Sequence, residues 1–403
     1  MSAPENTPMP ASIAPKAPPK KRDWSWRSQA FRGLLYQILA IVAIGAAVWW
    51  LATNAQENMR VRGIKSGFDF LSQPAGFDIG EELVNYDSSN PYWRAFWAGI
   101  VNTLRVAVIG IVLTTILGTL VGVGRFSRNG LVRGICYAYV EFFRNIPVLL
   151  QLLMWYLLFT ELLPEAAEPM QLGNVFISKA GLTYPIPVWA LGFLWAIIAM
   201  VLGCVAAYFY RGFARKKFEA TGKPQSMFLI PLTIICVAGV LGWALGGAPT
   251  ALHIPKKGEF AVEGGGSLSP EFISVLLGLT FYTAAFVAEV VRSGIQSVPR
   301  GQSEAAMAIG LTKGQEMRQV LLPQALRVII PPMTNQFLNL TKNSSLAVAI
   351  GYPDVVSIAN TAINQTGRAV ECIALIMAVY LTTSLTTSLF MNWYNNKSAI
   401  KER

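Results

Sequence analysis

Long apolar stretches recur along the whole of this sequence, and they limit its fold more than any other feature. A helix needs about 20 consecutive, mostly apolar residues to cross the roughly 30 Å hydrocarbon core of a bilayer. Only 14% of the residues are charged, against roughly 25% in soluble domains. We therefore predict an all-α fold, a polytopic transmembrane helical bundle of about eight spans. The eight stretches cover residues 33–51, 96–122, 146–163, 186–208, 227–246, 272–291, 328–351 and 371–393.

The stretch at 328–351 is the most polar of these, and the distribution of charge decides whether it spans. With a cytoplasmic N-terminus and eight spans, the segments inside the cell carry roughly three times as many Lys and Arg residues as those outside, as the positive-inside rule requires. If residues 328–351 did not cross, the basic tail at 396–403 would lie outside. We therefore expect eight crossings, with the N- and C-termini both in the cytoplasm.

The residue types that carry most enzyme chemistry are scarce. His253 is the single histidine, and Cys136, Cys204, Cys236 and Cys372 are scattered without metal-ligand or disulfide-scaffold spacing. No glycine-rich sequence of the phosphate-binding form GxxxxGK[ST] is present. The net charge of +11 does not indicate nucleic-acid binding, because the basic residues follow the membrane topology. We predict no catalytic residue, no metal site and no cofactor in this chain.

The segment at 292–327, which the topology places inside the cell, has a helical periodicity that two glycines divide into two short helices. Thr312 and Gln315 have the spacing of a capping box for the second helix. We expect Pro323 to end or kink that helix. A helix-turn-helix on the cytoplasmic face needs a partner to cover its apolar side, so this segment predicts an interaction surface.

This segment resembles the EAA loop of the membrane subunits of ATP-binding-cassette (ABC) importers. In that family the loop forms a coupling helix, which sits in a groove of a separate ATPase subunit and passes the motion of the ATPase to the spans. The resemblance implies a type I ABC importer-like core. One position departs mildly, because the family usually has isoleucine where this chain has valine. The matching residues, which the resemblance assigns to ATPase coupling, are Glu304, Ala305, Ala306, Gly310, Val320, Leu322 and Pro323.

Three further stretches are similar to permeases for polar amino acids. Residues 138–156 resemble the second-helix motif of those permeases, residues 281–300 resemble the run before their EAA loop, and residues 335–350 resemble their next span. Asn343 stands in the last stretch where those permeases often have an acidic residue. The layout of the whole chain is similar to that of the Q-type membrane subunit of the general L-amino acid importers of Gram-negative bacteria.

The extent of this similarity predicts how the chain is divided. It covers residues 96–163 and 271–395, and the remaining segments are additions to that shared part. The N-terminal tail is rich in Pro, Ala and Lys, a composition typical of disorder. The expected parts are a disordered basic cytoplasmic tail at 1–32, an extra N-terminal span and periplasmic loop at 33–95, a permease domain at 96–395 with inserted spans at about 164–270, and a cytoplasmic tail at 396–403.

The resemblance implies a transport subunit and not an enzyme. It describes the membrane channel subunit of an ABC importer that carries L-amino acids across the bacterial inner membrane. ATP and Mg²⁺ belong to a partner, an ABC ATPase subunit dimer. The other implied partners are a second permease subunit, related or identical, a periplasmic amino-acid-binding protein, the L-amino acid substrate and membrane lipid, with no nucleic acid.

Polar side chains in the 328–351 stretch are the candidates for the substrate path. An amino acid is a zwitterion, which does not cross an apolar core without polar lining. Asn335, Asn339 and Lys342 are spaced by four and three residues, so they share one helix face. Lys342 is suited to meet the substrate carboxylate; alternatively, it pairs with Glu289 or extends to the membrane interface. Gln151, in the stretch at 146–163, is a further candidate. The full set is Gln151, Asn335, Gln336, Asn339, Lys342, Ser344 and Ser345.

Two other functions stay open at this level. A secondary transporter driven by an ion gradient also uses polar and broken spans. It predicts intramembrane acids for ion coupling, and Glu289, near the end of a span, is the one candidate. A membrane enzyme needs a cluster of catalytic side chains at one depth, which the sequence does not supply. The EAA loop favours the importer over both.

Overall fold

The computed structural model of the chain describes residues 29–61, 63, 66–81, 83–222, 226 and 229–398. Most of the expected N-terminal tail (residues 1–28) and of the C-terminal tail (residues 399–403) therefore lies outside the described residues. The chain forms two separate units, Met1–Ser66 and Gly67–Arg403. The first contains the helix α1 (Gln29–Val61), so that helix already begins at residue 29 of the expected tail. It is long and apolar enough to cross a membrane, as expected of the extra N-terminal span.

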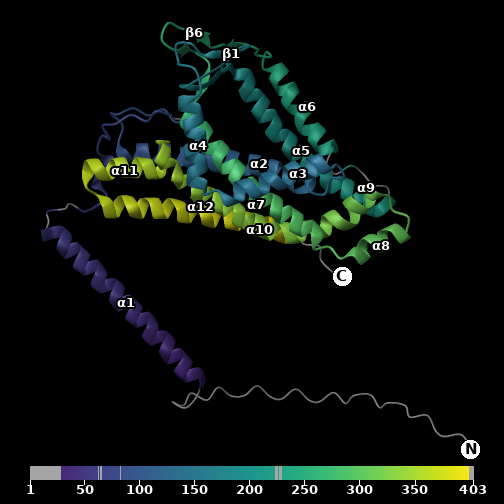
Figure 1. The fold of residues 1–403 in the computed structure, drawn as a ribbon, viewed down its shortest axis with the longest axis horizontal. Helices are drawn as coiled ribbons and strands as arrows, with labels where there is room; N and C mark the ends of the chain where they lie inside the picture. The colour runs from purple at the N-terminus through teal and green to yellow at the C-terminus, as the bar shows by residue number, and fades with distance from the viewer. Residues whose placement is uncertain are drawn as a thin grey trace, which may run out of the picture. The chain divides into compact units, whose positions relative to one another are not determined.

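Four long helices that run side by side make up much of the second unit (Figure 1). α7 is the most enclosed of them, because 56% of its apolar window is buried, against 33% for α2 and none for α12. It packs against α2 along one flank and α10 along another. The four helices are α2 (Tyr92–Gly124), α7 (Pro270–Gln296), α10 (Leu322–Asn343) and α12 (Ala369–Ser398).

Local sequence signals fix where α7 begins. The Ser269 side chain caps the helix by accepting a hydrogen bond from the backbone N–H of Phe272 at 3.0 Å. Pro270 takes the first helical position, where its missing N–H costs nothing. The buried face of the helix then consists largely of small residues such as Ala284, Ala285 and Ala288, which let neighbouring helices approach closely.

The expected span at 146–163 is the second half of a bent pair. The first half is the amphipathic helix α3 (Gly130–Asn145), and the second is the apolar helix α4 (Val148–Glu161). The two helices bend by 106° at the break. Pro147 accounts for the break, because a proline pushes the preceding residue out of the helical region, and Ile146 has a ψ of 128°.

Short strands connect the inserted helices to the bundle, and the sequence pattern did not predict them. Because each has only two to four residues, no alternation of apolar and polar residues is long enough to identify them. Four form an antiparallel sheet in the order β1-β2-β3-β8, and the others form two-stranded pairs. The strands are β1 (Met170–Leu172), β2 (Val175–Ser178), β3 (Gly181–Tyr184), β4 (Ile186–Pro187), β5 (Leu252–His253), β6 (Lys256–Lys257), β7 (Val262–Glu263) and β8 (Gly266–Leu268).

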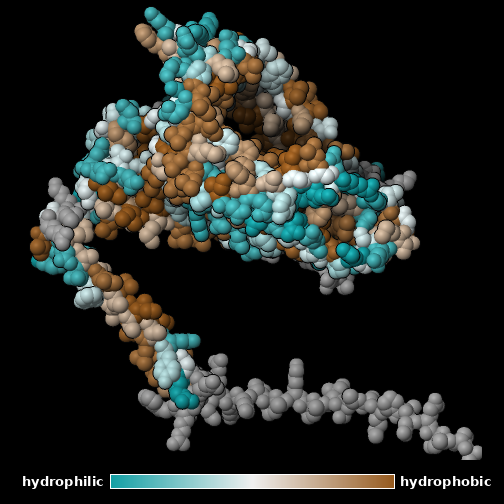
Figure 2. Space-filling view, in the orientation of Figure 1, coloured by the Kyte–Doolittle hydropathy of each residue, from teal (hydrophilic) through white to brown (hydrophobic). Residues whose placement is uncertain are grey.

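The inserted helices α5 (Leu191–Thr221) and α6 (Leu229–Leu245) form a hairpin that packs chiefly on itself. Gly203 and Gly242 lie in the hairpin interface, where a side chain would collide with the partner helix. The outer faces of the hairpin are apolar, and Figure 2 shows brown surface over this region and over α4. Such a face is suited to lipid or to another membrane helix.

The polar stretch at 328–351 is helical, but it is longer than expected. Helical backbone continues from α9 (Lys313–Glu316) through η2 (Met317–Leu321), a π-helical turn, into α10. We expected Pro323 to end or kink the helix, and it does not end it. The widened π turn directly before it accommodates the missing N–H and the ring, which would clash in a regular α-helix. After α10 come η3 (Ser344–Ile350) and, beyond a 49° bend, α11 (Val355–Thr366).

Within the described residues, five helices are long and apolar enough to cross a membrane alone, and the two bent pairs raise the number to seven. We predicted about eight. The difference is α6, which is apolar but, with 17 residues, shorter than the others. The predicted class, a mostly helical multi-span bundle, is confirmed.

Candidate functional site

The segment that resembles the EAA loop folds as two short helices at one end of the bundle, while α11 lies at the other end (Figure 1). The first helix is α8 (Arg300–Ala308). Gly310 ends it with a φ of +77°, in the left-handed region that favours glycine. The N–H of Gly310 donates to the carbonyl oxygen of Met307 at 3.0 Å, and that of Leu311 donates to Ala306 at 3.1 Å. These bonds close the end of α8 in the manner of a glycine C-cap.

Side-chain hydrogen bonds hold the loop in one shape. The predicted capping box is present, because the N–H of Thr312 donates to Oε1 of Gln315 at 2.9 Å and the reciprocal bond is also made. The hydroxyl of Ser303 in α8 donates to the Glu316 carboxylate of α9. The amide of Gln324 in α10 donates to Oε1 of Gln302 in α8 at 3.2 Å. The loop is therefore preorganised.

The exposed surface of α8 is more apolar than the EAA triplet suggested. Ala306 points inward and is only 2% exposed, whereas Glu304 and Ala305 face outward. Met307 is 57% exposed and Ile309 is 76% exposed. Sequence reasoning missed these two side chains, although two large apolar residues beside an exposed triplet are a usable signal. The remaining members of the coupling set flank the turn into α10: Gly310 and Leu322 are exposed, and Val320 and Pro323 are half-buried.

The predicted polar stripe lies on α10 with its three main members exposed. Asn335, Asn339 and Lys342 share the face of α10 that no other helix of the unit covers. Gln336 is half-buried at the edge of this face. Ser345 is half-buried too, and its hydroxyl donates to the Lys342 carbonyl oxygen at 2.7 Å. These five residues therefore lie close together on one side of the helix.

Two members of the candidate set lie elsewhere. Ser344 is buried, and its hydroxyl donates to the carbonyl oxygen of Thr341 at 2.7 Å. Gln151 is 1% exposed, and its amide donates to the carbonyl oxygens of Phe143 and Ile146, each at 2.9 Å. It closes the corner between α3 and α4. Because both side chains are buried and engaged in local hydrogen bonds, the structure does not bring them to the stripe.

The Lys342 ammonium group is uncommitted. Within the described part of the chain, its Nζ takes part in no ion pair and no side-chain hydrogen bond. The alternative that Lys342 pairs with Glu289 is wrong, because that carboxylate binds Arg125 at 2.6 Å and also Arg292. A free ammonium group beside two exposed amides is suited to bind a carboxylate.

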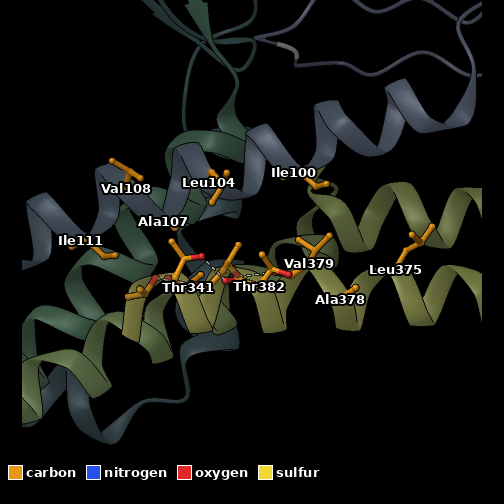
Figure 3. Close-up of a pocket in the computed structure, with 13 residues that line it drawn as sticks. Ile100, Leu104, Ala107, Val108, Ile111, Thr341, Leu375, Ala378, Val379 and Thr382 are labelled. Atoms are coloured by element: carbon orange, nitrogen blue, oxygen red, sulfur yellow. Dashed lines mark hydrogen bonds between the residues drawn. The ribbon is translucent and has the colours of Figure 1, made fainter. Parts of the chain in front are cut away.

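A groove of about 470 Å³ between α2 and α12 is apolar in character (Figure 3). Its lining includes Ile100 and Leu104 of α2 and Val379 of α12. Four of the five threonines that line it direct their hydroxyls to backbone carbonyls, as Thr386 does to Thr382 at 2.8 Å. No member of the predicted stripe lines this groove, so it is not a path suited to a zwitterion.

A buried ion pair lies toward the end of the bundle that is opposite to α8 and α9. Arg105 of α2 pairs with Glu81, and the two side chains are only 13% and 9% exposed. The guanidinium group also lies over the ring of Phe272, 3.9 Å from its centroid. Ser269, the cap of α7, donates to the same carboxylate. Arg105 therefore has a structural partner, and the sequence did not reveal it because Glu81 lies in a loop without periodicity.

Among the described residues, no three His, Cys, Asp or Glu side chains are grouped in a way that could hold a metal ion. The geometry thus offers a preorganised surface on the loop of α8 and α9, and a polar stripe with a free ammonium group. Neither is an arrangement for bond-making chemistry, because no activated nucleophile or acid–base pair belongs to it.

Comparison with known proteins agrees with this picture. Residues 225–398 match the family described as "Binding-protein-dependent transport system inner membrane component". The general L-amino acid transport system permease protein AapQ of Rhizobium johnstonii is 45% identical over 94% of this chain and 96% of its own. The putative amino-acid ABC transporter permease protein YhdX of Escherichia coli is 44% identical over 95% of this chain and 98% of its own.

A solved structure of an amino acid ABC transporter with histidines is also similar. It covers 76% of this chain and 95% of its own, with a TM-score of 0.45 and 20% identity. The identity to the two curated permeases extends over nearly the whole of each chain. The chain therefore belongs to the family of permease subunits that form the inner membrane components of binding-protein-dependent ABC transport systems.

Proposed function

We propose that this chain is the channel-forming subunit of an importer that carries L-amino acids across the bacterial inner membrane. The observation that carries the proposal is the cytoplasmic loop, a preorganised helix pair with an EAA pattern and an exposed apolar surface. The names of the relatives, a general L-amino acid permease and a putative amino-acid permease, supply the substrate class. ATP and Mg²⁺ are bound by a partner ATPase.

The exposed side chains of α8 are the proposed contact with an ABC ATPase subunit of the dimer. Met307 and Ile309 leave large apolar surfaces in water, and fully burying such a side chain contributes about 1.5–3 kcal/mol. Glu304 adds a charge beside them that orients the contact. Ser303 fixes α8 to α9, and Gln302 fixes α8 to α10. A movement of α8 that the ATPase causes therefore moves α10 as well.

The polar stripe of α10 is the proposed lining of the substrate path. It faces out of this subunit, so a second permease subunit, related or identical, completes the path from the other side. The Lys342 ammonium binds the substrate carboxylate, and the amides of Asn335 and Asn339 accept from the substrate ammonium group. These contacts replace the water that a zwitterion loses on leaving the aqueous phase.

The proposed orientation places the EAA loop and both termini in the cytoplasm, and the distribution of Lys and Arg supports it. The end of the bundle with α11 and the strands then faces the periplasm, where a loaded amino-acid-binding protein docks. ATP-driven closure of the ATPase dimer pushes on α8 and opens the path outward. Release to the cytoplasm follows hydrolysis.

Co-purification tests the proposal directly. The chain is expressed with the proteins encoded beside it, captured on a tag, and reconstituted in proteoliposomes that contain ATP. We expect an ATPase to be captured together with the chain, and uptake of radiolabelled L-amino acids to require both ATP and the binding protein. Replacement of Glu304 and Gly310 should release the ATPase. Uptake by the chain alone, driven by an ion gradient without an ATPase, would contradict the proposal and favour a secondary transporter.

A further inference from the structure

The Glu289 carboxylate is the centre of an arginine cluster at the cytoplasmic-loop end of the bundle. Its Oε2 lies 2.6 Å from a guanidinium nitrogen of Arg125, at the C-terminal end of α2. Both carboxylate oxygens accept from Nε of Arg292, one turn further along α7, at 3.1 Å. Arg144, at the end of α3, approaches to 4.0 Å. One carboxylate thus connects the ends of three helices.

The helices that this cluster joins are already in backbone contact. A Cβ at Gly118 of α2 would lie 2.9 Å from the carbonyl oxygen of Ala284. One turn further, a Cβ at Gly122 would lie 2.8 Å from that of Ala288. Neither position has room for a side chain, so α2 and α7 pack without an intervening layer. The Arg125–Glu289 ion pair holds α2 and α7 together at the end where α7 leads into the loop.

The position of the loop explains what the ion pair between α2 and α7 does. α7 ends at Gln296, and α8, the proposed ATPase contact, begins only four residues later at Arg300. A push on α8 arrives first at the last two turns of α7, where Glu289 is found. If those turns were free of α2 and α3, the push would bend α7 locally. With the Arg125–Glu289 contact in place, α2 and α7 move together.

The charge balance shows that Glu289 has no substitute. Three cations surround it, and no second carboxylate joins the cluster among the described residues. Without Glu289, the positive charges of Arg125 and Arg292 would repel each other. Solvent would screen this repulsion only weakly, because the Arg125 side chain is 12% exposed and that of Glu289 is 27% exposed. Loss of the carboxylate would therefore push the ends of α2 and α7 apart and would not merely remove one contact.

We propose that Glu289 is a positioning residue for energy coupling, which joins the end of α7 to Arg125 of α2 so that force from the cytoplasmic loop moves both helices as one body. The proposal rests on the proposed function, because it assumes that α8 receives the motion of an ATPase. Arg292 has the lesser role of orienting the carboxylate within α7.

The test uses the complete transporter, with its ATPase and second permease subunit, in proteoliposomes. Two quantities are measured: ATP hydrolysis, with and without the loaded binding protein, and radiolabelled L-amino acid taken up per ATP hydrolysed. We expect Glu289→Gln and Arg125→Gln to lower uptake per ATP by roughly 2- to 30-fold, the range typical of mutations that weaken coupling between sites. Basal hydrolysis should stay near that of the wild type. Arg292→Gln should have the smaller effect because the contact between helices survives.

Two comparisons separate coupling from simple loss of structure. Glu141→Gln on α3 is the matched control, since Glu141 is exposed and, among the described residues, its carboxylate hydrogen-bonds only Asn145 of its own helix. The double variant Glu289→Gln/Arg125→Gln should be no worse than Glu289→Gln alone, because it also removes one of the cations that Glu289→Gln leaves unpaired, and residues that act as one pair are not additive. If Glu289→Gln does not assemble, Arg125→Gln and Arg292→Gln still test the proposal, since both keep the carboxylate. The proposal then requires that Arg125→Gln lower uptake per ATP more than Arg292→Gln does.

Equal effects of Arg125→Gln and Arg292→Gln, or a wild-type ratio of uptake to ATP in Glu289→Gln, would overturn the inference while leaving the proposed function intact. A wild-type complex in which the loaded binding protein does not stimulate ATP hydrolysis would overturn the proposed function itself, and this inference with it.

Discussion

Gln302 and Gln324 lie on different helices, and the 3.2 Å hydrogen bond between their side chains fastens α8 to the first turn of α10. The loop of α8 and α9 is therefore attached to the bundle at both ends, through the chain to α7 and through this bond to α10. A rigid attachment of this kind requires that the turn between α8 and α9 keep its shape as well. That turn depends on Gly310.

Replacement of Gly310 by proline should abolish uptake while leaving membrane insertion unchanged. Gly310 has a φ of +77°, whereas proline fixes φ near −65°. The turn must therefore rearrange, and α8 leaves its position against α9. Uptake in cells and the amount of protein in the membrane fraction are measured together. Gly314→Ala is the matched control, because a Cβ there meets nothing within 4 Å and Gly314 lies inside α9. Wild-type uptake by Gly310→Pro would contradict the coupling role of the turn.

Serine in place of Ile309 or Met307 should weaken capture of the ATPase. Each substitution removes an exposed apolar side chain from the proposed contact, and a loss of about 1.4 kcal/mol corresponds to a tenfold weaker affinity. The measurement is the amount of ATPase that co-purifies as salt and detergent are varied. Leu252→Ser is the control, because it also replaces an exposed apolar side chain by serine. Leu252 lies in β5, in the insertion between α4 and α7. Equal loss of ATPase in both cases would point to a general effect on the protein.

The sequence predicted the parts of this molecule that depend on local pattern. Apolar length located the spans, and the spacing of Thr312 and Gln315 predicted a capping box that the structure contains. The spacing of Asn335, Asn339 and Lys342 predicted a shared face of α10, which is exposed. Each of these features is decided within one or two helical turns, where periodicity and capping rules apply.

The features that the sequence did not reveal depend on distant contacts. Arg105 pairs with Glu81 of a loop, and Glu289 with Arg125, 164 positions away. β3 pairs with β8 across the whole α5–α6 hairpin. Local patterns carry no information about such partners. One of the two outcomes expected of Pro323, that it ends the helix, is wrong for another reason, because the preceding turn widens to a π-helix and so tolerates the ring.

Asn339→Ala and Lys342→Ala should lower amino acid uptake while the ATPase remains bound. Both side chains are exposed on α10 and are not needed for packing, so the loss should fall on transport and not on assembly. For Lys342→Ala we expect a higher apparent KM, since a charge-assisted bond to the substrate carboxylate contributes about 1.5–3 kcal/mol. Lys256→Ala on β6 controls for the loss of an exposed lysine. Normal transport by Asn339→Ala and Lys342→Ala at normal expression would remove the stripe from the path.

Substitution of Arg105 by methionine should destabilise the protein more than simultaneous replacement of both members of its ion pair. Alone, it leaves the Glu81 carboxylate buried without a counter-charge, which costs about 3–5 kcal/mol. The double variant Arg105→Met/Glu81→Gln removes that charge and should recover most of the loss. Thermal unfolding in detergent measures the difference, with Arg215→Gln as the control because Arg215 is 76% exposed in its pair with Glu219. A double variant less stable than Arg105→Met would contradict this prediction. It would mean that the Glu81 carboxylate stabilises the protein chiefly through its hydrogen bond with Ser269 and not through Arg105.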